Sequence, residues 1–222
     1  MVVLERRFLA VAAMLGAAAF GMLEAAQSLL RADRSFAEPM SAYAVGPYGS
    51  VQTVAFVILA LGSAAVCAGL SSPRRRPPDW QMSRVLIGVW SFGVSLAAVF
   101  RVDVDGSSSS AGQVHGAASM LSFVAILTAM FFFTGAARQV ADWRSFGRLS
   151  SALAGTATVA FVVAAATQPS IAFGVAQRVF LGAVVVWIVA IGARLYVLGR
   201  TRNVEAESST GRVQRGGSEP AC

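Results

Sequence analysis

Apolar residues fall into six blocks along the 222-residue chain, separated by short segments rich in arginine, glycine, proline and serine. A helix must contain about 20 apolar residues to cross the ~30 Å hydrocarbon core of a bilayer, since it rises about 1.5 Å per residue. The pattern therefore predicts membrane-spanning helices over the residue ranges 8–30, 51–70, 85–100, 115–137, 149–167 and 175–198.

The blocks are continuously apolar, whereas the strands of a membrane barrel alternate between apolar and polar positions. Hydrophobic residues make up 56% of the chain and charged residues 13%, compared with roughly 25% charged residues in soluble domains. We expect an all-α integral membrane protein, a six-transmembrane-helix bundle over residues 1–198. The polar residues 199–222 are expected to form a disordered tail.

The positions of the charges predict the orientation of this bundle. All 18 basic residues are arginine, and the net charge is +7. With six spans, only Arg31, Arg34, Arg101 and Arg178 fall on one side of the membrane. The arginine-rich side is the cytoplasmic one, so both termini are expected in the cytoplasm. Topology and contacts with lipid headgroups account for the basic charge, and no nucleic-acid partner is expected.

Polar residues within the spans gather toward the predicted outer ends. Glu24 and Gln27 share one face of the first span, and His115 and Ser119 lie one turn apart on the fourth. Ionisable groups in a membrane are costly and therefore mark functional sites. We expect an outward-facing polar pocket with a set of ligand-binding residues: Glu24, Arg101, Asp103, His115, Ser119, Gln177 and Arg178.

Several of these residues also have a purely structural interpretation. Glu24 can pair with Arg101 or Arg178 to neutralise its charge in lipid. Serines in spans often donate to carbonyl groups of their own helix, and a lone histidine at a helix start is often a packing residue. Sequence alone leaves both interpretations open.

The first functional hypothesis is a binding protein for a membrane lipid headgroup or a small polar ligand, with Arg101 and Arg178 contacting an anionic group. A second is a membrane-embedded enzyme in which Asp103 or Asp105 orients His115 for acid–base chemistry. A third is a carrier or channel component, although no predicted span contains the proline that often breaks carrier helices. Binding is favoured over catalysis.

No metal or other cofactor is expected. A structural zinc ion takes four Cys, His or carboxylate ligands and a catalytic one three, and the chain has one histidine. The same count excludes a haem held by two histidines. Cys67 and Cys222 give no disulfide framework, and the sequence assigns neither a role.

Three short motifs resemble a known family. They are F-x-x-D ending at Asp103, His115 followed by Gly-Ala-Ala, and G-V-A-Q-R ending at Arg178 with Trp187 downstream. They resemble the bacterial six-span membrane proteins called domain of unknown function 998. The resemblance implies a bacterial plasma-membrane location and supplies no biochemical activity. Gln177 stands where this family is expected to carry glutamate, so a possible acid is missing there.

Overall fold

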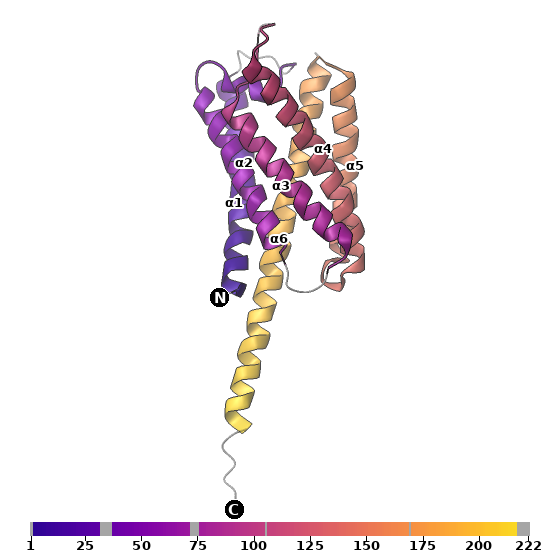
Figure 1. Ribbon diagram of the computed structural model, residues 1–222. Helices are drawn as coiled ribbons and strands as arrows, with labels where there is room; N and C mark the ends of the chain where they lie inside the picture. The colour runs from indigo at the N-terminus through magenta and orange to yellow at the C-terminus, as the bar shows by residue number, and fades with distance from the viewer. Residues whose placement is uncertain (1, 32–36, 72–75, 105, 169, 217–222) are drawn as a thin grey trace, which may run out of the picture.

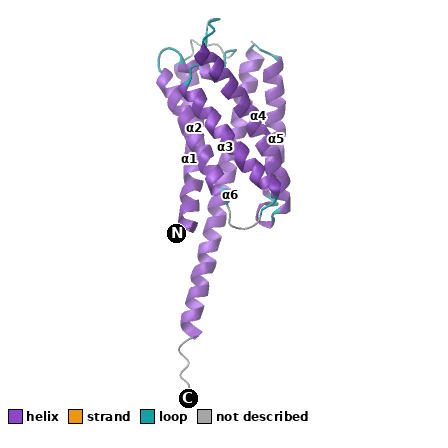
Figure 2. Cartoon of the chain, in the orientation of Figure 1, coloured by secondary structure: helices purple, strands orange, loops and turns teal. Residues whose placement is uncertain are grey.

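The structure, a computed structural model, describes residues 2–31, 37–71, 76–104, 106–168 and 170–216, with side chains from Glu5 to Thr201 among them. All regular structure in these residues is helical (Figures 1 and 2). The long helices are α1 (Val2–Leu30), α2 (Gly49–Gly69), α3 (Pro78–Val99), α4 (Ser110–Gln139), α5 (Phe146–Ala166) and α6 (Ile171–Gly216). Two short 3-10 helices are η1 (Met40–Ala44) and η2 (Ala141–Trp143).

The predicted fold class is confirmed, because all six long helices contain a segment long and apolar enough to cross a membrane. The orientation of the termini relative to the membrane stays a prediction. The boundaries of α2 and α5 lie within a few residues of the predicted ranges.

The helices α3 and α4 begin earlier than their apolar blocks, and polar residues or proline stabilise their first turns. Pro78 occupies the first turn of α3, where its missing N–H costs nothing, and Asp79 follows it. Ser109 caps α4, and its hydroxyl oxygen accepts the Gly112 N–H at 3.0 Å. Hydrophobicity alone detects neither extension.

The predicted disordered tail differs from the structure, in which α6 continues without a break to Gly216. No proline interrupts residues 199–216, and arginine, glutamate and alanine within them favour helix. The membrane-compatible part of α6 ends at Thr201. Cys222 lies outside the described residues.

The helices form a closed ring in which each packs on its neighbours in the chain and α6 packs against α1 (Figure 1). α1 and α2 approach closely at a pair of glycines, where a Cβ on Gly16 would lie 3.0 Å from the Gly62 Cα. Small residues at such crossings let helix backbones meet. We call the end of the bundle that contains the start of α4 the His115 end. Toward this end α4 and α5 diverge (Figure 1).

Candidate functional site

A cavity of about 620 Å³ lies inside the His115 end of the bundle. Its walls come from η1 and the segment preceding it, and from α2 to α6. The volume falls within the range of small-molecule sites, roughly 300–1,000 Å³. Most of the lining is apolar, so its few polar groups determine how a ligand would be oriented.

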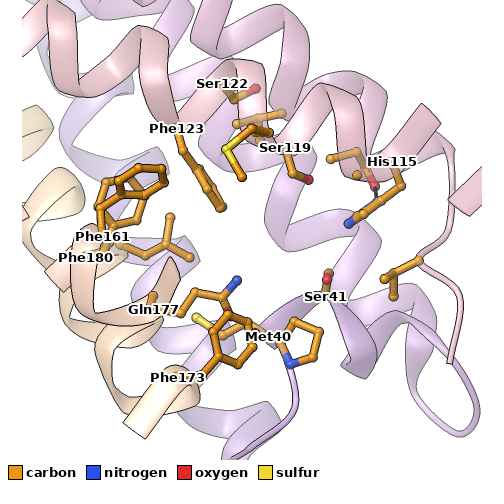
Figure 3. A pocket seen from close by; sticks show the side chains of 18 of the residues that line it. Met40, Ser41, His115, Ser119, Ser122, Phe123, Phe161, Phe173, Gln177 and Phe180 are labelled. Carbon is orange, nitrogen blue, oxygen red and sulfur yellow. Dashed lines mark hydrogen bonds between the residues drawn. The ribbon is translucent and has the colours of Figure 1, made fainter. Parts of the chain in front are cut away.

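The deep part of the cavity is aromatic, and we call its four rings the aromatic floor: Trp90, Phe123, Phe161 and Phe180. The ring centroids of Phe123 and Phe180 are 4.9 Å apart, and those of Phe161 and Phe180 are 5.8 Å apart. Figure 3 shows the three phenylalanines together on one side of the cavity. Such rings offer a large apolar surface at fixed positions.

Polar side chains also line the cavity, and we call four of them the polar rim: Ser41, His115, Ser119 and Gln177. They come from η1, α4 and α6, and Figure 3 shows His115 and Ser41 on the side away from the phenylalanines. Gln177 lies on the same side as Phe161 and Phe180 in Figure 3. Within the described part of the chain, the hydroxyl groups of Ser41 and Ser119 make no hydrogen bond. The nearby Ser122 hydroxyl donates to the Ala118 carbonyl oxygen instead.

The hydrogen bonds of His115 fix the proton on its ring. Its Nδ1 atom lies 2.7 Å from the Phe100 carbonyl oxygen and 3.1 Å from that of Ala97. Two acceptors on one side require Nδ1 to carry the hydrogen, so in the neutral ring Nε2 is an acceptor. His115 thereby ties α4 to the end of α3 and presents a lone pair at the cavity.

A similar argument orients Gln177. Its Oε1 atom accepts the backbone N–H of Met40 at 2.8 Å, so the amide nitrogen is the group left for other contacts. Met40 begins η1, and all five residues of that short helix are buried. Gln177 therefore anchors η1 against α6 and supplies N–H donors to the polar rim.

Asp103 lies apart from His115, in the loop before α4. Its carboxylate accepts the backbone N–H and the hydroxyl of Ser109, each at 2.7 Å. A Cβ on Gly112 would overlap this carboxylate. Asp103 thus organises the start of α4, and among the described residues no carboxylate orients the His115 ring. The alternative partner, Asp105, lies outside the described residues.

The hydrogen bonds from Ser109 lower the pKa of the Asp103 carboxyl group. A depressed folded-state pKa adds stability that is present above the unfolded value of about 4 and is lost as the pH falls through the folded value. We expect thermal unfolding in detergent to show wild-type stability declining below about pH 4, with less decline for Asp103→Asn. Equal pH profiles would contradict this role.

Glu24 and Arg178 belong to a separate buried polar cluster between α1, α2, α6 and η1. Gln52 donates a hydrogen bond to Glu24 Oε1. Arg178 donates to the Tyr43 hydroxyl at 3.0 Å and to the Gly174 carbonyl at 2.9 Å. Glu24 and Arg178 also attract each other electrostatically. Neither residue lines the cavity.

This second cluster contains buried acceptors that lack hydrogen bonds. Glu24 is 6% exposed, and Gln27 and Gln52 are fully buried. Glu24 Oε2, Gln27 Oε1 and Gln52 Oε1 accept no hydrogen bond from the described residues. Unsatisfied buried groups cost about 1–3 kcal/mol each. The chain therefore keeps this cluster at a substantial energetic cost.

The structure thus divides the predicted site residues into groups. His115, Ser119 and Gln177 line one cavity, Glu24 and Arg178 lie together outside it, and Asp103 holds the loop before α4. Arg101 is exposed and also lies outside the lining. Sequence reasoning missed Ser41 and the aromatic floor. No sequence pattern identifies Ser41. The aromatic residues of the floor lie within apolar spans, where aromatic residues are common and do not by themselves indicate a site.

The described residues contain no group of three or more His, Cys, Asp and Glu side chains placed to hold a metal ion. Cys67 is half-buried, and its thiol donates to the Arg84 carbonyl oxygen at 3.3 Å.

Six apolar helices and a mostly apolar cavity with a polar rim define a helical multi-pass membrane protein with an internal site. The family described as protein of unknown function (DUF998) matches residues 10–194, and the chain belongs to this family. The resemblance inferred from the motifs is therefore confirmed. No curated protein and no solved structure matches the chain.

Proposed function

We propose that this protein binds an amphipathic membrane lipid in the cavity at the His115 end. The polar end of the lipid would contact the polar rim, and its hydrocarbon part would lie on the aromatic floor. The observation that carries the proposal is the combination of polar and aromatic lining within one cavity of about 620 Å³. By volume it accommodates the equivalent of about 20 water molecules at ~30 Å³ each.

The composition of the lining favours a lipid over a small polar ligand. Burial of apolar surface contributes roughly 25 cal/mol per Å², and a small polar molecule would leave the aromatic floor without a partner. A lipid uses both parts of the cavity. This refines the predicted pocket, because Arg101 and Arg178 lie outside the lining and do not supply charge to a ligand there.

The position of the cavity supports exchange with the bilayer. Gly116 and Met120 of α4 and Ala165 of α5 line the cavity, and all three are exposed. α4 and α5 diverge at this level (Figure 1). A lipid would pass between them without crossing water. With the predicted orientation, it would come from the outer leaflet of the bacterial plasma membrane.

Binding is better supported than catalysis. The acid–base hypothesis needs a carboxylate that orients His115, and Asp103 is bonded to Ser109 instead. The Nδ1 atom of His115 is held by backbone carbonyls, which position the ring without adding charge. A carrier function is supported by no observation specific to this cavity.

The proposal is tested by blocking the entrance with Gly116→Leu. A Cβ at Gly116 meets no atom within 4 Å, so the longer side chain can be accommodated at the mouth of the cavity without disrupting the backbone. We expect the purified variant to retain at least tenfold less co-purified lipid than wild type, measured by mass spectrometry after delipidating washes, corresponding to ~1.4 kcal/mol of lost binding.

Gly155→Leu is the matched control. Gly155 is also an exposed helical glycine with nothing within 4 Å of an added Cβ, and it lies outside the cavity. We expect Gly155→Leu to retain lipid as wild type does. Equal retention in both variants and the wild type would contradict the proposed function.

A further inference from the structure

We infer, resting on the proposed lipid binding, that the polar end of the bound lipid is an uncharged hydroxyl group. The inference comes from the hydrogen-bonding capacity that the polar rim leaves unused. It replaces the anionic headgroup expected from sequence with a ligand of different chemistry.

The first requirement on the ligand is a hydrogen-bond donor. His115 is 5% exposed, and its Nδ1–H is already shared between two carbonyl oxygens at 2.7 and 3.1 Å. In the neutral imidazole, a hydrogen on Nδ1 leaves Nε2 without one. Its Nε2 atom therefore accepts a hydrogen bond and has none to donate.

The second requirement is a hydrogen-bond acceptor. Gln177 has used its Oε1 atom on the Met40 N–H, and it presents only amide N–H donors to the cavity. A ligand that meets both Gln177 and His115 must accept from one and donate to the other. A hydroxyl group can take either role, since it both donates and accepts, and the Ser41 and Ser119 hydroxyls are equally adaptable.

A negative charge is disfavoured by the same lining. Carboxylates and phosphates are acceptors, so they would oppose the Nε2 lone pair of His115. No arginine lines the cavity among the described residues, and its charged lining residue is the acidic Glu38. An anion buried there would lack the positive partner that offsets its loss of hydration.

A positive charge fits only in part, although the Glu38 carboxylate in the lining would attract it. An ammonium group would donate to His115, but its hydrogens would oppose the amide hydrogens of Gln177. It has no lone pair to accept from them. The alkylamine is therefore the closest competitor to the alcohol and belongs in the test.

The experiment compares four probes that share one chain and differ in the head: 1-hexadecanol, hexadecanoate, hexadecylamine and hexadecyl phosphate. Binding to the full-length protein, in a detergent without hydroxyl groups at pH 8, is measured by competition against retained lipid. We expect hexadecanol to bind about tenfold more tightly than either anion. An anion would leave the buried Nε2 atom of His115 without a hydrogen bond, and an unpaired buried polar group costs about this much.

Two variants test the roles of the named groups. In His115→Asn the shorter amide can still donate to the α3 carbonyls, but it lacks an atom at the Nε2 position, so the preference for hexadecanol over the other probes should be lost. In Gln177→Glu a carboxylate oxygen can still accept the Met40 N–H, while the second oxygen replaces the donor. The preference should then move toward hexadecylamine.

The outcomes separate the two proposals. Equal or tighter binding of hexadecanoate, hexadecyl phosphate or hexadecylamine in the wild type would overturn the hydroxyl inference and leave lipid binding intact. An unchanged preference for hexadecanol in both variants would overturn it as well. Failure of all four probes to bind, together with unchanged lipid retention in Gly116→Leu, would reject lipid binding itself.

Discussion

Replacing Arg178 by methionine is expected to lower the free energy of unfolding by about 1–3 kcal/mol, since the buried Glu24 carboxyl group loses the nearby positive charge that attracts it. Glu24 is 6% exposed and is attracted to Arg178. The substitution also removes the hydrogen bond from Arg178 to the Tyr43 hydroxyl, which ties α6 to η1. Chemical unfolding in detergent measures the loss.

A double-mutant cycle isolates the electrostatic attraction between Glu24 and Arg178 from the other contacts of Arg178. Glu24→Gln keeps a carbonyl oxygen that can accept the hydrogen bond from Gln52 and removes the negative charge. The double variant Glu24→Gln/Arg178→Met should be at least ~1 kcal/mol more stable than the sum of the two single effects predicts. Strict additivity would show that the pair does not interact.

Replacing Phe180 by alanine is expected to cost about 3–5 kcal/mol of stability, because a fully packed aromatic ring leaves a cavity behind. Phe180 is 1% exposed and lies between Phe123 and Phe161 in the aromatic floor. Its removal deepens the cavity. Under the proposed function, the retained lipids should shift to longer hydrocarbon chains, which mass spectrometry detects.

Phe146→Ala provides the control for this shift. Phe146 is also buried, at 8% exposure, but it packs on Phe133 and Trp143 outside the cavity. The Phe146→Ala variant should be less stable than wild type, and the chain length of its retained lipids should be unchanged. A change in the chain length of the retained lipids in both variants, or in neither, would contradict the proposed contact between the lipid chain and the aromatic floor. Phe180→Leu gives a milder deepening if the alanine variant does not fold.

The fold was predictable because the bilayer imposes a simple length requirement on apolar segments. Six blocks of sufficient length correspond to the six long helices of the structure. Two of the differences occur where polar residues or proline decide the boundary, whereas the continuation of α6 to Gly216 reflects residues that favour helix. Ser109 and Pro78 start α4 and α3 outside their apolar blocks, and hydropathy does not detect such local hydrogen bonds and backbone restrictions.

The site was predictable only in part. The spacing of His115 and Ser119 places both on one helical face, and their presence in the cavity follows from that face being turned inward. The partners of His115 were not predictable, because they are backbone carbonyls of Ala97 and Phe100, which every sequence supplies at every position. Nearness in sequence suggested Asp103, which binds Ser109 instead.

The sequence by itself determined the class of protein, the number of spans and the end of the bundle at which polar side chains gather. These properties depend on lengths and spacings along single helices. Only the tertiary structure decided that Glu24 and Arg178 lie apart from His115, and that η1 brings Ser41 to the polar rim. Those relations depend on how helices pack around one another and on where a loop folds back. Both relations are determined by packing contacts between segments that are distant in sequence, and residue spacing within one segment does not predict such contacts.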